Sequence, residues 1–545
     1  MKIKRKTIGF LALAISLQVL ALLVFTAQKK GYFIDEIYSW GLSNGYYKPF
    51  VTSYDVFGRW VEGEELLKYM TVQPGEGFSA GSVWYNQGQD VHPPFFYLML
   101  HMVCSFTPDV YGTWQGMVLN VPAYAGCLLM TFLTARLLLR SDKKAMAAMA
   151  IWGLSPGGLS TGDYIRMYML MTFFASASMY LHVKMFLKGQ NGRRLAGICL
   201  VTFLGLLTQY YFVFFAFFCS AVYVLGKIKG RKWKEAAIYS AALLGAVGAM
   251  VLAFPACIGQ LARPDEFVAT ETRNNLSTGG MVATNLISYI SSINMDFLGG
   301  CIRPVAAGGL LLAMFCLWGR WKRGRDGNGE ATGGGKGTEG EAKAEKKTAL
   351  ALTVILLLCF LSVSWVAVVP GARYIYNLYP LMAVLAVWWV DRLVAWGLGK
   401  GGKTIWVYTG LLAVVASLFV KGYIQGHVQY LYPENQKRVA LADAYSHCYC
   451  LYINNYENSP LTQDLVELCG FRGVYAMPRE GIRQVKEVLK GKDVQGGLIV
   501  YVDTNEFWSS GYDGETVMEE LREATGFRGY THLYSHELSE TYLLQ

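Results

Sequence analysis

The sequence predicts an α-helical polytopic membrane protein with a small α/β domain at its C-terminal end. Three observations predict this class. Of the 545 residues, 53% are hydrophobic and only 16% are charged, whereas soluble domains have about 25% charged residues. Apolar runs of roughly 14 to 23 residues, the length range of membrane spans, recur between residues 7 and 420. After residue 422 these runs stop, and short strand-like and helix-like segments alternate.

The N-terminal end is expected to lie in the cytoplasm. Lys2, Lys4, Arg5 and Lys6 precede the first apolar run, 7–27, and basic residues favour the cytoplasmic side of a span. The run lacks the small-residue cleavage pattern of a secretory signal, so we expect a retained anchor. The formal net charge is +10, but the basic residues cluster in short loops between apolar runs. This pattern indicates membrane topology and not nucleic-acid binding.

The segment 28–112 is expected to be an outer loop with juxtamembrane helices. Its most apolar stretch, 95–106, follows Pro93 and Pro94 and is short for a span. A crossing there would place the basic residues around Arg140 on the outer face, against the positive-inside rule. We therefore interpret 95–106 as a juxtamembrane or re-entrant helix that begins at the two prolines.

The other apolar runs alternate consistently across the membrane. Together with 7–27 they give about eleven spans, with the C-terminal domain on the extracytoplasmic side: 113–139, 145–159, 164–186, 195–208, 210–225, 236–258, 305–318, 348–369, 378–394 and 404–420. The Gly-, Lys- and Glu-rich segment 319–347 is expected to be a disordered cytoplasmic loop. Residues 1–422 are thus expected to form the membrane domain of a multi-pass plasma-membrane protein.

The remaining segment, 423–545, reads as an extracytoplasmic α/β domain. Helical patterns at 436–445, 461–468, 482–489 and 515–524 alternate with strand patterns at 448–453, 473–477 and 497–502, and a strand pair is expected in 529–544. The domain has no Gly-x-Gly-x-x-Gly motif and no P-loop, so no nucleotide site is expected.

The 11 cysteines carry no C-x-x-C or Cys/His metal spacing and are expected to be small buried residues. Cys257 and Cys301 flank one outer loop. The sequence leaves open whether these two residues form a disulfide.

Two adjacent acids, Asp35 and Glu36, lie about eight residues beyond the first apolar run. This spacing places them at head-group depth, among aromatic residues of the kind found at membrane interfaces: Tyr32, Phe33, Tyr38 and Trp40. A transporter would carry ionisable groups near the middle of its spans. Here the unusual polar residues fall instead in outer loops or at outer span ends: Asp90, His92, Asp163, Arg166, Arg273 and Arg373. The distribution favours a reaction at the outer leaflet.

Such a set of residues suits transfer of a sugar from a lipid phosphate. Arginine binds phosphate with two parallel hydrogen bonds, and His adds charge. A carboxylate can deprotonate the acceptor hydroxyl as a general base, while the cations stabilise the phosphate that leaves. The arrangement parallels inverting glycosidases, with an acceptor hydroxyl in place of water.

Four motifs occur in order along the chain: Asp35-Glu36, Asp90-Val-His-Pro-Pro-Phe-Phe-Tyr97, Tyr164-Ile-Arg-Met-Tyr-Met169 and Ala372-Arg-Tyr-Ile-Tyr376. Together they resemble the C-type polytopic glycosyltransferases of the dolichyl-phosphate-mannose protein mannosyltransferase and aminoarabinose-transferase-like family. The resemblance covers residues 1–420. It implies the C-type glycosyltransferase fold, a polyprenyl-phosphate sugar donor and transfer on the extracytoplasmic face.

The resemblance also implies roles for single residues. Asp35 matches the family's catalytic acid, with Glu36 as its neighbour in the catalytic site. His92 stands where some members have Lys near the lipid phosphate, and Arg166 and Arg373 match phosphate-facing arginines. The substrate-binding set is completed by Asp90, Tyr97 and Asp163. No cofactor is implied with certainty, and a divalent metal, if bound, would contact His92 or Glu36.

The expected protein is thus an inverting hexosyl- or pentosyltransferase that uses a polyprenyl-phosphate sugar. Its acceptor is left open among a glycan, a lipid and a protein, and membrane lipids are its surroundings. The alternative is a transporter or flippase of lipid-linked sugars. A third option, a ligase using a lipid-diphosphate oligosaccharide, would require a larger cation cluster or a metal.

Overall fold

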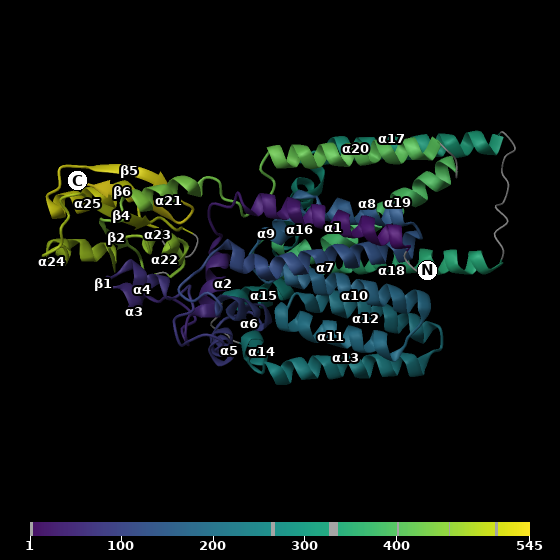
Figure 1. Ribbon diagram of the computed structural model, residues 1–545, viewed down its shortest axis with the longest axis horizontal. Helices are drawn as coiled ribbons and strands as arrows, with labels where there is room; N and C mark the ends of the chain where they lie inside the picture. Colours follow the sequence, from purple (N-terminus) through teal and green to yellow (C-terminus); the bar gives the residue numbers. More distant parts are fainter. Residues whose placement is uncertain (1–3, 263–266, 326–335, 400–402, 457, 507–510) are drawn as a thin grey trace. The chain divides into compact units, whose positions relative to one another are not determined.

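The computed structural model describes residues 4–262, 267–325, 336–399, 403–456, 458–506 and 511–545 (Figure 1). The chain divides into two compact units. The first consists of Met1–Ala27, Val91–Phe96 and Met117–Gln429, and the second of Gln28–Asp90, Tyr97–Gly116 and Tyr430–Gln545. The boundary expected near residue 422 lies close to the division after Gln429. However, most of the outer segment 28–112, expected to belong with the membrane domain, is part of the second unit.

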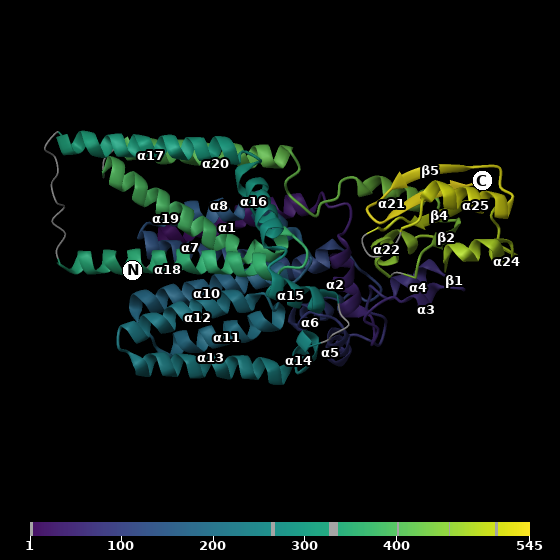
Figure 2. The same ribbon diagram turned by 180° about the vertical axis from the view of Figure 1, so that it is seen from behind.

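The first unit is helical. Its helices are α1 (Arg5–Thr26), α7 (Thr113–Leu139), α8 (Asp142–Gly153), α9 (Pro156–Asp163), α10 (Tyr168–Lys188), α11 (Gly192–Thr208), α12 (Phe212–Lys229), α13 (Trp233–Ala253), α14 (Ala256–Ala262), α15 (Phe267–Thr278), α16 (Val282–Leu298), α17 (Ile302–Arg325), α18 (Lys336–Val366), the 3₁₀ helix η1 (Ala372–Leu378), α19 (Tyr379–Leu398) and α20 (Lys403–Ile424). Helices α10, α11, α12 and α13 lie side by side (Figures 1 and 2).

Nine helices of the described residues are long and apolar enough to cross a membrane: α1, α7, α10, α12, α13, α17, α18, α19 and α20. Large leucines on their outer faces are exposed, for example Leu252 at 83% and Leu310 at 63%, as suits a surface that meets lipid tails. The chain is a multi-pass membrane protein, and the predicted class is confirmed.

Two of the eleven expected spans, 145–159 and 195–208, are shorter than these nine. They form α8 and α11, of 12 and 17 residues. The first run breaks because Ser155 accepts a hydrogen bond from Gly158 N at 2.9 Å and caps a new helix, α9, at Pro156. A capping serine followed by proline is a helix-start signal, and it divides the apolar run into two helices.

The expectation of a disordered loop at 319–347 is wrong at both ends. Helix α17 continues to Arg325, and α18 begins at Lys336; residues 326–335 lie outside the described residues. Contacts of charged side chains hold these two helix ends in place. Arg323 donates to the carbonyl oxygens of Trp396 and Gly397 at 2.6 and 2.9 Å, and Arg140 forms ion pairs with two glutamates of α18, Glu341 and Glu345.

The second unit contains the predicted α/β domain. Its helices are α2 (Ile34–Asn44), α3 (Ser53–Val56), α4 (Gly63–Leu67), α5 (Ala80–Gln89), most of α6 (Phe95–Cys104), α21 (Asn435–Ala444), α22 (Asn458–Gln463), α23 (Leu465–Leu468), η2 (Arg479–Gln484), α24 (Val485–Val488) and α25 (Gly514–Thr525). Its strands are β1 (Trp60–Val61), β2 (Tyr449–Ile453), β3 (Gly473–Met477), β4 (Leu498–Asp503), β5 (Tyr530–Ser535) and β6 (Ser539–Leu544).

The six strands form one sheet in the order β1-β3-β2-β4-β6-β5. Strand β2 runs parallel to β3 and β4, and β6 pairs antiparallel with β4. The core is built by alternate strand residues and by helix α25, and includes Leu451, Val500 and Leu521, which are completely buried. Every helix and strand expected after residue 430 is present.

Strand β1 was not expected from the sequence. It comes from the outer segment and pairs antiparallel with β3, with Trp60 opposite Tyr475. The Trp60 indole donates to the carbonyl oxygen of Val488 at 3.1 Å and packs edge-on against Tyr449 at 5.0 Å. This strand ties the outer segment to the C-terminal domain within one unit.

All eleven cysteines are free, so the disulfide considered for Cys257 and Cys301 is absent. The sulfur of Cys301 instead accepts a hydrogen bond from Lys421 Nζ at 2.9 Å.

Candidate functional site

The eight candidate residues divide equally between the two units. His92, Asp163, Arg166 and Arg373 belong to the first unit, and Asp35, Glu36, Asp90 and Tyr97 to the second.

Helix α2 carries the acid pair in its first turn. Acids are favoured there because the first backbone N–H groups of a helix point at them. Glu36 Oε2 accepts a hydrogen bond from the backbone N–H of the N-cap residue Phe33 at 2.8 Å, as the acidic N3 residue does in a capping box. The beginning of this helix is therefore fixed by Glu36, and with it the position of Asp35.

Glu36 also forms a buried ion pair. Lys29 Nζ lies 2.9 Å from Glu36 Oε1, and neither side chain is exposed to solvent. The same ammonium donates to the carbonyl oxygen of Tyr430 at 2.6 Å. Sequence reasoning missed Lys29, because nothing in the sequence distinguishes it from Lys30, which is exposed. The contact joins α2 to the start of the C-terminal segment.

Asp35 is partly exposed, and its carbonyl oxygen accepts a hydrogen bond from Ser39 Oγ at 3.0 Å. The aromatic residues around it were expected at a membrane interface. Trp40, however, is completely buried within the protein. Its ring contacts Tyr32 at 4.8 Å and Tyr111 at 6.1 Å, so it supports α2 from within the protein.

The other two candidates of the second unit are also buried. Asp90, the C-cap of α5, is 8% exposed, and Tyr97 on α6 is completely buried. Their neighbour His101 fixes the start of α5, because its Nε2 accepts a hydrogen bond from Ser79 N at 2.9 Å. This contact fixes the start of α5 within the unit.

In the first unit, Asp163 ends α9, and Arg166 follows in the turn before α10. Asp163 is completely buried and Arg166 is 3% exposed. The side-chain amide of Asn120 donates to the carbonyl oxygens of Gly162 and Tyr164, at 3.0 and 2.8 Å. Asn120, which sequence reasoning missed, thus holds the turn that presents both candidates.

The motifs of Arg166 and Arg373, about two hundred residues apart in sequence, are in contact. Tyr168 of the first motif meets Tyr374 of the second edge-on at 6.1 Å. Tyr374 stacks on Tyr211 at 4.9 Å, and the Arg373 guanidinium lies 5.2 Å from the centre of the Tyr374 ring. A row of tyrosine rings therefore supports Arg373 in η1.

The segment that contains His92 contacts helix α10. His92 is partly exposed, and Phe95, three residues later, contacts Phe174 of α10 at 6.3 Å. Helix α10 is thus the common neighbour of three candidate segments in the first unit.

A buried acid that sequence reasoning missed supports two of these segments. Asp296 of α16 is completely buried and accepts a hydrogen bond from the Tyr379 hydroxyl, directly after η1. Both side chains press on Gly157 of α9, where an added Cβ would lie 2.7 Å from each. Only glycine fits at this contact. The contact holds α9, which ends in Asp163, against the chain that follows Arg373.

Among the described residues, no group of three or more His, Cys, Asp or Glu side chains is arranged to hold a metal ion. Of the two residues considered as metal ligands, Glu36 does not fit, because the Lys29 ammonium lies 2.9 Å from its oxygen, where a metal would bind.

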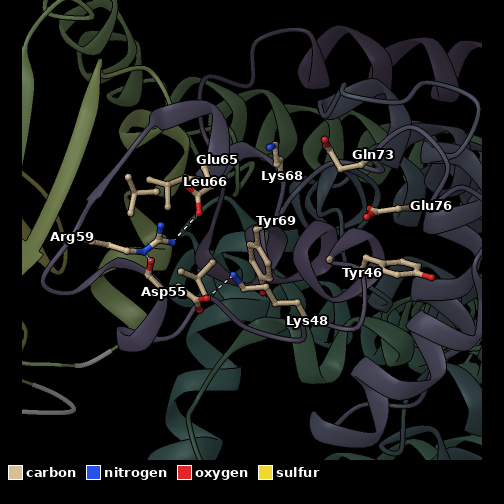
Figure 3. A pocket seen from close by; sticks show the side chains of 13 residues that line it. Tyr46, Lys48, Asp55, Arg59, Glu65, Leu66, Lys68, Tyr69, Gln73 and Glu76 are labelled. Atoms are coloured by element: carbon tan, nitrogen blue, oxygen red, sulfur yellow. Dashed lines mark hydrogen bonds and ion pairs between the residues drawn. The ribbon is translucent and has the colours of Figure 1, made fainter.

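A small cavity of about 240 Å³ lies among residues of the outer segment (Figure 3). Its walls are closed by two ion pairs, Lys48 with Asp55 and Arg59 with Glu65, each at 2.8 Å. All four side chains are between 28% and 48% exposed. Surface pairs of this kind contribute little to stability, and the four charged groups of the two pairs already have partners.

These features define a class: a polytopic helical membrane protein with acids and arginines at span ends and an α/β domain after its last span. No family model and no curated protein matches the chain. The chain does match solved structures. The chain is similar to ArnT from Cupriavidus metallidurans bound to undecaprenyl phosphate, with a TM-score of 0.50, 12% identity and 98% of each chain covered. The apo state of ArnT gives the same TM-score and coverage at 13% identity.

The archaeal oligosaccharyltransferase AglB from Archaeoglobus fulgidus, in complex with an inhibitory peptide and a dolichol-phosphate, is more distant. It has a TM-score of 0.42 and 10% identity, over 90% of this chain and 69% of AglB. The likeness to ArnT, at low identity and full coverage, shows the fold. The C-type glycosyltransferase fold implied by the four motifs is thereby confirmed.

Proposed function

We propose that this protein is a membrane glycosyltransferase that moves a sugar from a polyprenyl-phosphate donor to an acceptor hydroxyl on the extracytoplasmic face. The observation that carries the proposal is Asp35, partly exposed in the first turn of α2, a helix start fixed by the buried Lys29–Glu36 pair. The ArnT fold supports it, because that neighbour is described with undecaprenyl phosphate bound.

In the proposed reaction, Asp35 accepts the proton of the acceptor hydroxyl as its oxygen attacks the anomeric carbon. The bond between that carbon and the phosphate oxygen breaks, and the sugar's configuration inverts. The leaving lipid phosphate gains negative charge. Arg166, Arg373 and His92 are proposed to bind it, since preorganised cations stabilise charge that develops in the transition state.

The other candidates take supporting roles in this proposal. Glu36 belongs to the catalytic site as a positioning residue, because its oxygens hold Phe33 N and Lys29. Asp90, Tyr97 and Asp163 are proposed to contact the substrates. The sugar is a hexose or pentose, the N-terminus is cytoplasmic, and the C-terminal domain is extracytoplasmic.

The test is Asp35→Asn in membranes supplied with a labelled polyprenyl-phosphate sugar. We expect transfer to fall by at least about 10²-fold, the lower range for loss of a general base. The matched control is Asp109→Asn in the same unit, an exposed residue at φ 59°, where Asn is readily accommodated. Transfer at the wild-type rate in Asp35→Asn would contradict the assignment. Movement of the lipid-linked sugar across the membrane without its consumption would favour a flippase.

A second experiment identifies the donor. Lipids extracted after deletion of the gene should contain an accumulated polyprenyl-phosphate sugar, whose sugar is then read by mass spectrometry. No accumulated lipid-linked sugar in the deletion strain would contradict the proposed donor class.

A further inference from the structure

The second unit contains a cavity that no step of the proposed reaction uses. Its volume is about 460 Å³, within the range of small-molecule sites. One wall comes from the outer segment before and within α2, including Lys29, Tyr32 and Ile37, and the opposite wall from helices α21 and α23, including Arg438 and Glu467. All of these residues belong to the same compact unit.

The walls hold polar side chains that are almost completely buried. Asn435 is 4%, Gln463 7%, Arg438 5% and Glu467 6% exposed. Arg438 and Glu467 pair with each other, and Gln463 Nε2 lies 3.2 Å from His536 Nε2; a cavity lined by polar groups held in place in this way is suited to a ligand that forms hydrogen bonds. Gly31 contributes to this construction, because an added Cβ would lie 2.1 Å from the Asn435 amide nitrogen.

The buried charges in the walls are paired, and the two exposed charged residues of the lining, Lys30 and Asp443, are of opposite sign. Lys29 is paired with Glu36 at 2.9 Å, and Arg438 with Asp464 and Glu467 at 2.8 and 3.2 Å. A site for phosphate or another anion would present cations without carboxylates beside them. The balance therefore favours a neutral polar ligand.

The remaining lining groups fit hydroxyl groups. The side-chain amides of Asn435 and Gln436 each offer donors and an acceptor, and Gln463, whose Nε2 hydrogen-bonds His536 Nε2 at 3.2 Å, adds its oxygen as an acceptor. A hydroxyl group both donates and accepts. Tyr32 and Tyr111 add aromatic rings 6.3 Å apart, against which the apolar face of a sugar ring can pack. Amides beside aromatic rings thus match the chemistry of carbohydrate.

The cavity lies on a different face of α2 from the proposed base. Ile37 lines it, and Asp35 is two residues earlier, about 200° around the helix. A bound molecule in the cavity is therefore separated from the Asp35 side by the width of the helix, about 10 Å. A single sugar ring does not span that distance, whereas a chain of sugars does.

We propose that this cavity is a carbohydrate subsite, which binds a part of an oligo- or polysaccharide acceptor remote from the hydroxyl that reacts. This inference rests on the proposed glycosyltransferase function and adds to it the chemical class of the acceptor.

The test is a substitution that fills the cavity and leaves α2 unchanged. Ala440 lines the cavity and is exposed, so Ala440→Trp should obstruct it. Ala444→Trp, on the same helix and outside the lining, is the matched control. Full-length protein is assayed in membranes of the deletion strain with the labelled lipid-linked sugar. Two products are measured: label in glycan, and free sugar released when water replaces the acceptor.

We expect Ala440→Trp to lower transfer into glycan by about tenfold or more, the effect of a lost contact of moderate strength, with hydrolysis of the donor unchanged. Asn435→Leu should raise the acceptor KM and leave kcat unchanged. Equal transfer in Ala440→Trp and Ala444→Trp would overturn the proposal, as would label found in protein instead of glycan. Loss of both transfer and hydrolysis in Ala440→Trp would also overturn it, because the cavity would then serve catalysis itself. A wild-type protein with neither activity would instead refute the glycosyltransferase function.

Discussion

The buried pair of Lys29 and Glu36 gives a sharp prediction about stability. Both side chains are fully buried, and their charged atoms are 2.9 Å apart. Lys29→Met keeps the length of the aliphatic chain and removes the ammonium, which leaves the Glu36 carboxylate buried without its cation. Removing one partner of a buried pair costs about 3–5 kcal/mol.

The second unit has about 200 residues, so the loss corresponds to a fall in Tm of roughly 6 to 20 °C for that unit. Melting can be followed with a thiol-reactive dye, because Cys104, Cys448 and Cys450 of this unit are buried and become reactive on unfolding.

Two comparisons make the test specific. Lys30→Met changes the neighbouring exposed lysine and should leave the Tm unchanged. The double variant Lys29→Met/Glu36→Gln removes both charges and should recover a large part of the loss, because no uncompensated charge remains buried. If Lys29→Met melted like the wild type, or if the double variant were no more stable than the single one, the pair would not hold α2 as argued.

Three further predictions concern the rest of the site. Arg373→Gln should raise the donor KM by about 10- to 100-fold, the effect of a charge-assisted hydrogen bond of 1.5–3 kcal/mol, measured by initial rates against lipid-linked sugar. Burial raises the pKa of the Glu467 carboxyl to about 7 from 4.5. As the pH rises from about 4.5 to 7, this carboxyl ionises in the unfolded chain before it does in the folded protein, so the stability of the folded protein falls. The Tm of Glu467→Gln, measured over the same pH range, should not show this fall. Gly157→Val should lower the Tm of the first unit, because its Cβ would meet Asp296 and Tyr379 at 2.7 Å.

The C-terminal domain was predictable because its signals are local. Each strand is a short apolar run between polar or glycine-rich turns, and α25 is preceded by its N-cap Asp513, whose side chain accepts a hydrogen bond from Thr516 N at 3.0 Å. Such caps and alternations can be read within ten residues. The spans were predictable for a similar reason, since the length and apolar composition of a run are enough to identify it as a membrane span.

What could not be predicted depends on contacts between distant residues. Strand β1 has two residues, Trp60 and Val61, which is too short to produce an alternating pattern. Asp296 is one acid in an apolar helix, and only its contacts with Tyr379 and Gly157 reveal its place. The four motifs can be read from the sequence, but the contact of Tyr168 with Tyr374 requires the fold.

The acid pair shows why the structure is needed to distinguish two adjacent acidic residues. In the sequence, Asp35 and Glu36 are equivalent carboxylates. In the fold, Lys29 balances the charge of Glu36 and removes it from solvent, while Asp35 stays partly exposed. An uncompensated second carboxylate would oppose ionisation of its neighbour. The buried lysine therefore distinguishes the two acids: Glu36 fixes the start of the helix, and Asp35 is the one we propose as the base for the acceptor hydroxyl.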